Sequence, residues 1–429
     1  MIKNSILTLI GTISICLGNV YGQYINIKID DIQMKYGPCE PSIAINPKDP
    51  NNLVAGSVLG RVYHSEDAGK TWISDTLSSP YGVYGDPCII ADNDGNFYYF
   101  HLADPQGKGQ TGTKWLDRMV CQKSIDGGKK WNQGTFTGLN AGKNQDKEWA
   151  IHDPVNDLIY LTWTEFDKYG SDDPQDSSYI LVSKSTDKGE TWSRPLRINQ
   201  QAGDCLDNDQ TVEGAVPAIG PQGQVYVAWS FNQRIYFNKS LDNGRTWAPN
   251  DLKIADQPGG WTFDIPGLGR ANGLPVTVCD MSDGPYQGTI YVNWSDQRNG
   301  INNTDIWISK STDGGKIWSS PFKINDDRSG RHQFFNWISI DQVTGYLYVI
   351  YYDRRNYKDT RTDVYLAYSM DGGETFTNEK ISESPFEPSV QAFFGDYNNI
   401  SAYNGIIRPI WTRADGTTLS VWTALINKK

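Results

Sequence analysis

Six copies of one short motif constrain the fold of this chain more than any other feature. Each copy reads Ser-x-Asp-x-Gly-x-x-aromatic, and we call it the box. The boxes begin at Ser65, Ser124, Ser185, Ser240, Ser311 and Ser369, at intervals of 55 to 71 residues. In a tight hairpin the Asp accepts hydrogen bonds from turn amides, the Gly takes a positive φ, and the aromatic residue packs on the core. Because the spacing recurs, the motif predicts a repeat architecture.

A second pattern recurs between the boxes, in which short alternating segments contain Gly-x-x-Tyr-x-x-Trp. Residues 288–294 show this pattern best, and residues 223–229 and 345–351 follow it closely. The alternation predicts half-buried antiparallel strands, with each box joining the third strand of a unit to the fourth. Four such strands form one blade of a β-propeller.

The positions at which first strands open predict the number of blades. They are Glu40, Asp86, Glu148, Glu213, Leu274, Asn336 and Asp396. We therefore predict an all-β propeller of seven four-stranded antiparallel blades; six blades plus a C-terminal cap are the alternative. The last unit stops one strand short after residues 419–425, and residues 24–29 have the length and β-branched content to supply its outer strand. This closure by an N-terminal strand would remove an open sheet edge.

The N-terminal sequence predicts where the protein is located, and its net charge limits the partners that it can bind. Residues 1–22 match a signal peptide, with Lys3, an apolar run over 6–17 and the small-residue exit 20–22. The run is too short for a membrane span, and no later segment resembles one. We expect a secreted or periplasmic protein in which residues 23–429 form a single propeller domain. A net charge of -11 argues against a nucleic-acid partner. The oligomeric state is left open.

The cysteines and histidines give no metal-binding spacing. The five cysteines after the signal segment are Cys39, Cys88, Cys121, Cys205 and Cys279. Because five is odd, at least one thiol stays free, and the sequence leaves the pairing of the others open. No cofactor is expected and metal ligands are unknown, which leaves room for a structural or channel cation such as Ca²⁺.

Charged residues at the strand openings are candidate catalytic groups. Asp86, Glu148 and Glu213 would face the central mouth, in a ring that Glu40 and Asp396 complete. Neighbouring carboxylates raise one another's pKa, so that one can stay protonated beside an ionised partner. Glycoside hydrolysis uses such a pair. Capping of strand amides, or binding of water or a cation, is the alternative role.

Loops on the face opposite the boxes carry the other candidates. The long insertions there are residues 103–116, 165–177, 251–273 and 326–335, and irregular loops on a rigid scaffold are common binding sites. Candidate substrate-binding residues are Arg234, Arg270, Arg331, Arg354, Arg413, His332 and Trp261. Guanidinium groups bind carboxylate or sulfate bidentately, and an indole can stack on a sugar. His101, which ends a second strand, is a candidate catalytic base or a packed interblade histidine.

The boxes match the Asp-box of the sialidase-like, BNR-repeat propellers, and the chain resembles that superfamily from about Glu40 to its end. The resemblance implies a secreted glycoside hydrolase that acts on an acidic glycan containing sialic acid or uronate. Sialidases carry an Arg-Ile-Pro signature near the first strand, where this chain has residues 39–43, Cys-Glu-Pro-Ser-Ile, and they have six blades. Seven-bladed relatives include polysaccharide lyases on uronate-containing glycans, so a lyase is one alternative. A propeller that binds glycan or protein without catalysis is the other.

Overall fold

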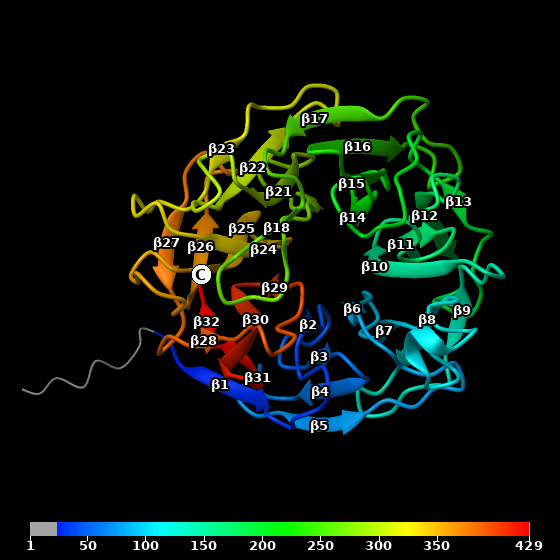
Figure 1. Cartoon of the computed structure of the whole chain (residues 1–429), viewed down its shortest axis with the longest axis horizontal. Coiled ribbons are helices and arrows are strands. Elements are labelled where there is room, and N and C mark those ends of the chain that lie inside the picture. Colours follow the sequence, from blue (N-terminus) through cyan, green and yellow to red (C-terminus); the bar gives the residue numbers. More distant parts are fainter. Residues whose placement is uncertain (1–23, 429) are drawn as a thin grey trace, which may run out of the picture.

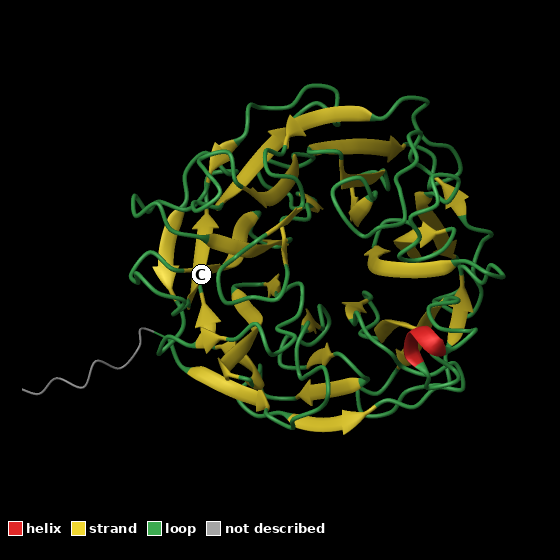
Figure 2. Ribbon diagram, viewed as in Figure 1, coloured by secondary structure: helices red, strands yellow, loops and turns green. Residues whose placement is uncertain are grey.

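Residues 24–428 are described by the computed structural model and form a ring of seven blades around a central axis (Figure 1). Apart from one 3₁₀ turn at Gly109–Thr111, the regular structure is β (Figure 2). The predicted seven-bladed propeller is thereby confirmed. The predicted signal segment, residues 1–22, lies outside the described residues. Within 24–428, no helix has the length and apolar composition that crossing a bilayer requires.

The first six blades are four-stranded sheets whose strands follow one another in sequence order. Blades one to three contain β2 (Ser42–Ile45), β3 (Leu53–Ser57), β4 (Arg61–Ser65), β5 (Ile73–Thr76); β6 (Cys88–Ala91), β7 (Phe97–Leu102), β8 (Met119–Ser124), β9 (Thr135–Thr137); β10 (Asn144–Asp153), β11 (Leu158–Phe166), β12 (Ser178–Ser185), β13 (Leu196–Arg197). Blades four to six contain β14 (Glu213–Ile219), β15 (Val225–Phe231), β16 (Arg234–Ser240), β17 (Leu252–Asp256); β20 (Val276–Cys279), β21 (Ile290–Asp296), β22 (Asp305–Ser311), β23 (Phe322–Lys323); β24 (Gln333–Asp341), β25 (Tyr346–Asp353), β26 (Asp363–Ser369), β27 (Thr377–Lys380). A separate hairpin pairs β18 (Thr262–Phe263) with β19 (Ala271–Asn272).

The seventh blade closes the ring with strands from both ends of the described residues. Its strands are β29 (Asn399–Tyr403), β30 (Ile406–Gly416), β31 (Thr418–Ala424) and β1 (Asn26–Asp30), and β28 (Glu387–Pro388) and β32 (Ile426–Asn427) also pair with β30. In the antiparallel pair of β1 and β31, Asn26 lies opposite Ala424 and Lys28 opposite Trp422 (Figure 1). The predicted closure by the N-terminal strand is correct, and the outer edge of β31 is paired.

The boxes form the hydrogen bonds that their sequence predicts. In the fifth box, Asp313 Oδ1 accepts bonds from the amides of Lys316 and Ile317, each at 3.0 Å. Ser311 Oγ donates to Asp313 Oδ1 and accepts the amide of Gly315 at 3.0 Å. All six boxes repeat the bond from the Ser hydroxyl to the Asp and the bond from the Gly amide to the Ser. These bonds fix each turn by itself, whatever the neighbouring blade.

Basic side chains join one blade to the box of the next. Lys184 Nζ, in the third blade, donates to the carbonyl of Asn243 in the fourth-blade box at 2.6 Å, and Lys310 Nζ likewise reaches Gly372 at 2.9 Å. At the closing seam, Arg408 takes the place of the second-strand tyrosine, lies buried, and donates to the Ala68 carbonyl of the first box at 2.7 Å. The seams therefore depend on backbone carbonyls that any box sequence supplies.

We expect Ser311→Ala to lower the free energy of unfolding by about 1–3 kcal/mol, because the buried amide of Gly315 loses its acceptor. Urea denaturation monitored by tryptophan fluorescence would measure the change. Thr312→Ala, at an exposed position of the same box, is the matched control and should leave the stability unchanged. Equal stabilities for the two variants would contradict a structural role for the box.

The five cysteines of the described chain are all buried and form no disulfide. Burial raises the pKa of the thiols, to about 12 for Cys88 and Cys279. They therefore behave as small core residues, and the bridges that the sequence left open do not form within residues 24–428.

Candidate functional site

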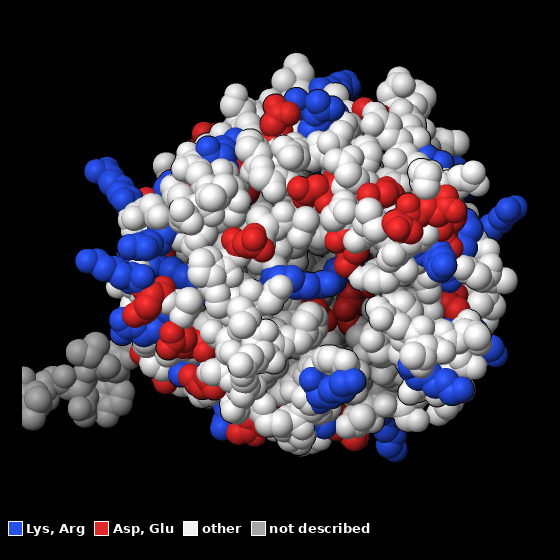
Figure 3. All heavy atoms as spheres, viewed as in Figure 1, with Lys and Arg blue, Asp and Glu red and all other residues white. Residues whose placement is uncertain are grey.

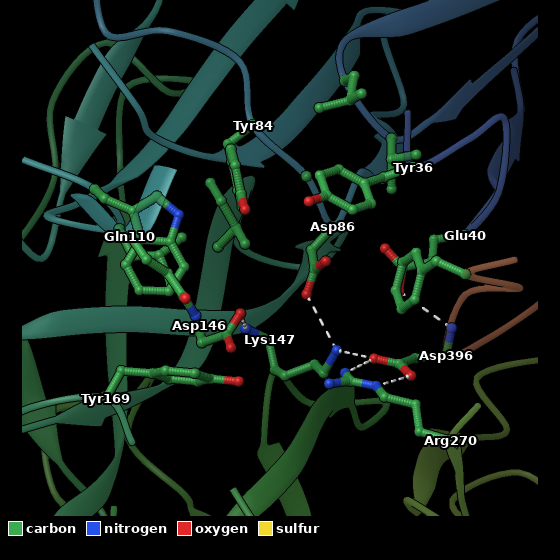
Figure 4. A pocket seen from close by; sticks show the side chains of 17 residues that line it. Tyr36, Glu40, Tyr84, Asp86, Gln110, Asp146, Lys147, Tyr169, Arg270 and Asp396 are labelled. Atoms are coloured by element: carbon green, nitrogen blue, oxygen red, sulfur yellow. Dashed lines mark hydrogen bonds and ion pairs between the residues drawn. The ribbon is translucent and has the colours of Figure 1, made fainter. Parts of the chain in front are cut away.

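A pocket of about 260 Å³ opens at the central mouth of the ring. First and third strands of a blade run in the same direction, so the first strands start at the end away from the boxes. The floor is made at those starts by Glu40, Asp86, Lys147 and Asp396 (Figure 4). Loop residues that include Tyr36, Tyr84, Trp115, Tyr169 and Phe393 form aromatic walls. Acidic atoms gather around the mouth in the space-filling view, with basic atoms beside them (Figure 3).

Left-handed backbone at the strand starts positions the floor residues. Glu40, Asp86 and Lys147 have φ values of 52°, 50° and 55°. For residues with a side chain this conformation costs about 1–2 kcal/mol. In the third blade it belongs to a bulge between Asp146 and Trp149, which turns the Lys147 side chain to the mouth. Strained backbone under three charged residues of one pocket is typical of a functional site.

Two cations hold the floor carboxylates of different blades together. Lys147 Nζ lies 2.6 Å from Asp396 Oδ2 and 3.4 Å from Asp86 Oδ2 (Figure 4). Arg270, from the 251–273 insertion, donates through Nε to Asp396 Oδ1 at 2.6 Å and through Nη2 to its other oxygen. Burial acts to raise the pKa of Asp396, but Arg270 and Lys147 outweigh it and hold that pKa well below its usual range. Asp396 is therefore ionised, with both oxygens engaged.

Two other carboxyl groups of the pocket, those of Asp146 and Glu40, hold a proton more readily than Asp396 does. Burial and the neighbouring Asp86 raise the pKa of Asp146 to about 7. Burial, Asp86 and Asp396 also raise the pKa of Glu40 well above its ordinary value, and Glu40 Oε1 accepts the amide of Asp396 at 3.1 Å. The pocket thus holds protonatable carboxyls beside carboxylates paired with cations, a combination that suits acid–base chemistry at neutral pH.

One wall carries a tyrosine bonded to an acid. Tyr169 donates its hydroxyl to Asp207 Oδ2 at 2.6 Å, and Arg270 Nη1 lies 3.5 Å from the same oxygen. Trp115 makes edge contacts with Tyr169 and Tyr84, at ring distances of 5.5 and 5.9 Å. Burial and the nearby carboxylates raise the pKa of Tyr169, so its phenol keeps its proton. The wall offers aromatic faces for a sugar ring, and the Tyr169 hydroxyl, whose proton is donated to Asp207, can accept a hydrogen bond.

The floor ends on an aromatic cluster that closes the central channel. The rings of Trp149 and Trp337 lie 4.3 Å apart, and Tyr397 lies 4.9 Å from Trp149. Below them, the inner strands line a separate space of about 230 Å³. The mouth pocket is therefore a blind site, open on the loop face.

Glu148 and Glu213 were expected at the mouth, and the structure places them beside the pocket instead. They are 1% and 0% exposed, and within the described chain neither carboxyl has a hydrogen-bond partner. Burial raises the pKa of both well above the ordinary value, with Asp86 adding to it for Glu148 and Asp207 for Glu213. The cause is the bulge at each strand start, which shifts side chains from one face to the other. Of the three expected carboxylates, Asp86 alone lines the pocket.

The two candidate histidines also lie away from the pocket lining. His101 is fully buried, and its Nδ1 is bonded to the Leu102 carbonyl at 2.8 Å. His332 is buried and contacts Thr304 Oγ1 at 3.0 Å. Burial lowers the pKa of each to about 4. Both are packed, neutral imidazoles.

The expected cluster of arginines does not form, because the loops use most of them for their own packing. Arg354 is buried and donates to Thr362 and to the Pro266 carbonyl, at 3.0 and 2.6 Å. Arg413 pairs with Asp415 at 2.8 Å. The pocket lining also lacks Arg234, Arg331 and Trp261. Arg234 is exposed on a hairpin, and Arg331 is half-buried. Trp261 is buried and donates its indole N–H to the Thr211 carbonyl. Arg270 is the expected binding residue that lines the pocket.

Sequence reasoning missed Lys147, Asp146, Tyr169 and Asp207. The run Asp146–Lys147–Glu148 at a strand start was a usable signal, since a bulge there can present two consecutive side chains. Tyr169 lies in the expected 165–177 insertion, but no local pattern marks it. Among residues 24–428, no group of three or more His, Cys, Asp or Glu side chains is arranged to hold a metal ion.

No protein-family model matches this chain. A sialidase of Bacteroides fragilis is 24% identical over 278 residues, which are 60% of this chain and 47% of the sialidase. A xyloglucanase of Acetivibrio thermocellus is 25% identical over 323 residues, which are 65% of this chain and 32% of the enzyme. The chain thus spans less than half the length of either relative.

The structural likeness extends over nearly the whole ring. An ulvan lyase of a new polysaccharide lyase family, solved with a bound GlcA-containing saccharide, has a TM-score of 0.56 at 12% identity, over 94% of this chain and 96% of the lyase. At such identity the likeness concerns the fold alone. The six boxes, the seven-bladed ring and the sialidase relative together support a sialidase-like β-propeller superfamily for this chain.

Proposed function

We propose that this protein is a carbohydrate-active enzyme that hydrolyses an acidic glycan, containing sialic acid or uronate, in the mouth pocket. One observation carries the proposal: an aromatic-walled blind pocket holds a carboxyl with a pKa of about 7 beside carboxylates paired with cations. The named activities of the relatives, sialidase, xyloglucanase and ulvan lyase, all concern carbohydrates.

In this proposal Asp146 and Asp86 have different catalytic roles. Protonated Asp146 donates to the leaving glycosidic oxygen, since its raised pKa keeps the proton available near neutral pH. Asp86, with Lys147 at 3.4 Å, faces the reacting sugar and stabilises the positive charge that develops on it. Water then adds to the anomeric carbon and gives its proton to the ionised Asp146, which restores the acid. Asp396 takes no direct part, because both of its oxygens are bound to Lys147 and Arg270.

Arg270 is the proposed anchor for the acidic group of the sugar. Its side chain is 45% exposed, and its bonds to Asp396 use Nε and Nη2, so that Nη1 points to the side where Asp207 lies at 3.5 Å. Lys147 is buried between two carboxylates, so its ammonium group is less accessible to a ligand than the guanidinium group of Arg270. The Nη1 side of the guanidinium, whose contact with Asp207 is long at 3.5 Å, is the part of Arg270 that we assign to a single carboxylate of the glycan.

Hydrolysis is favoured over β-elimination by the residues at the pocket. A lyase needs a base for the proton beside the uronate carboxylate, and no histidine is among the lining residues of the described chain. The raised pKa of Tyr169 makes its phenolate a poor candidate for that base. The proposal requires no cofactor, and a secreted or periplasmic location agrees with a glycan substrate outside the cell.

A substrate panel tests the proposal. The purified protein would be incubated with sialylated oligosaccharides, uronate-rich polysaccharides and neutral xyloglucan, and the products analysed by mass spectrometry. We expect cleavage of an acidic member with one water added per bond. Unsaturated, ultraviolet-absorbing uronate products would show a lyase instead. Cleavage of xyloglucan alone would contradict the proposal that the substrate is acidic. Binding without any cleavage would contradict the proposal that the protein is an enzyme.

A further inference from the structure

A second concave site, which we call the seam groove, lies between the third and fourth blades on the side of the boxes. Its volume is about 540 Å³, larger than the mouth pocket. Basic residues from both blades line it: Lys184, Arg194 and Arg197 from the third blade, and Arg245 from the fourth-blade box. In Figure 1 these blades are the ones built from β10–β13 and β14–β17.

The charge of the seam groove is not compensated by the protein. No aspartate or glutamate lines it, and within residues 24–428 none of its four cations lies within 4.0 Å of a carboxylate oxygen. The corresponding lysine at another seam, Lys310, has Glu374 at 2.6 Å. The net charge of the chain is -11, so these four uncompensated cations make the groove locally positive on a protein that is negative overall.

Two of the cations are fixed and two are available. Lys184 donates to the Asn243 carbonyl at 2.6 Å, and Arg197 donates to the Asn199 carbonyl at 2.7 Å. The exposed guanidinium groups of Arg194 and Arg245 make no hydrogen bond within the described chain. The groove therefore combines a rigid basic wall with two free bidentate donors, an arrangement suited to carboxylate or sulfate groups.

The cations of the groove lie close enough to affect one another. They surround Tyr160, which is fully buried at the base of the groove. Burial and the charge of Arg245 lower the pKa of Lys184, so the cations repel one another in the absence of an anion. A bound anion would relieve this repulsion.

We propose that the seam groove is a second binding site for an anionic polysaccharide, separate from the mouth pocket. The chemical class of its ligand, a chain with carboxylate or sulfate groups, rests on the proposed function. Because the two sites open on opposite faces of the ring, the groove would hold the protein on a polymer while the mouth remains free for another chain end.

Affinity electrophoresis through gels that contain polygalacturonate, chondroitin sulfate or neutral dextran tests the groove. We expect both anionic polymers, but not dextran, to retard the wild-type protein. Arg194→Glu with Arg245→Glu should weaken binding by about tenfold, because two exposed charge contacts are lost. The pair Lys70→Glu with Lys316→Glu is the control, since it gives the same charge change at the box position that Arg245 holds. Equal weakening by the control, or none by the groove variant, would overturn the proposal.

Two further measurements keep the outcomes separate. Arg194→Gln with Arg245→Gln removes the charges without reversing them, and it replaces the first variant if circular dichroism shows that the reversal disturbs the fold. Binding by an Asp146→Asn protein isolates the groove from catalysis. If the Asp146→Asn protein binds at wild-type strength through Arg194 and Arg245, and the wild-type protein cleaves no glycan of the panel, the groove proposal is supported and the proposed enzyme activity is refuted. If polymer binding is lost only with Asp146, the groove is wrong.

Discussion

Asp146→Asn should lower kcat on a confirmed substrate by about 10²–10⁴-fold, the range that a general acid contributes. The substitution keeps the shape of the side chain and removes the proton that the leaving oxygen would receive. Asp146 lines the pocket, is 8% exposed, and has a pKa raised to about 7 by burial and by Asp86. Substrate affinity should change little, because an amide still fills the same space.

The dependence of kcat on pH should show that Asp146 acts as an acid. A general acid acts in its protonated form, so wild-type kcat should be highest below the pKa of Asp146 and fall as the pH rises above about 7. In Asp146→Asn that descending limb should disappear, since asparagine does not titrate. Initial rates measured from about two pH units below neutral to about two above, with ionic strength held constant, would show both effects.

Asp264→Asn is the matched control, because Asp264 is exposed in the 251–273 insertion and does not line the pocket. It should keep the wild-type rate and profile. If Asp146→Asn retained wild-type kcat, or lost activity but kept the descending limb, another group would be the acid. Glu40, whose carboxyl is also raised in pKa and lines the same pocket, would then be the next residue to replace.

The fold was predictable because its determinants are local and repeated. Each box closes its own turn through bonds among residues that are no more than four positions apart, as Ser311, Asp313 and Gly315 show. The closure of the ring was predictable for a different reason. The last unit lacked one strand, residues 24–29 could supply it, and the pairing of Asn26 with Ala424 confirms that reasoning.

The floor of the site was only partly predictable, because its geometry depends on bulges. An alternating pattern says which residues share a face, but one inserted residue exchanges the two faces. The bulge at Lys147 and Glu148 brought the lysine to the mouth and left the glutamate buried beside it. Asp86 lies just before β6, whose pairing with β7 from Cys88 onward has no such shift, and its side chain lines the pocket.

The binding arginines could not be separated from structural ones by sequence. Arg270 and Arg354 both lie in long loops, yet Arg354 is buried against Pro266 while Arg270 reaches Asp396, 126 residues away. Only the folded ring determines which loop stands next to which strand start. The same holds for Lys147 and Asp396, which are 249 residues apart and belong to the third and seventh blades.

That long-range ion pair leads to the largest stability effect that we expect. Lys147→Met should lower the free energy of unfolding at neutral pH by about 3–5 kcal/mol, the cost of breaking a buried pair by removing one partner. Methionine replaces the lysine stem as far as Cε but leaves Asp86 without its cation at 3.4 Å and Asp396 with Arg270 alone. Thermal unfolding and urea denaturation would measure the loss.

The deficit should depend on pH in a defined direction. The pKa of Asp396 is held below its usual range in the folded state, so its ion pairs contribute stability above the unfolded pKa of about 4, and that contribution is lost as the pH falls further. Wild type and Lys147→Met should therefore differ most at pH 7 and converge in acid. Lys129→Met, which removes an exposed pair with Glu66, should melt like the wild type at every pH. If Lys147→Met also melted like the wild type at pH 7, the network would not hold the blades together, and the strained backbone beneath Lys147 would have to be stabilised by packing against Trp149 and its aromatic neighbours instead.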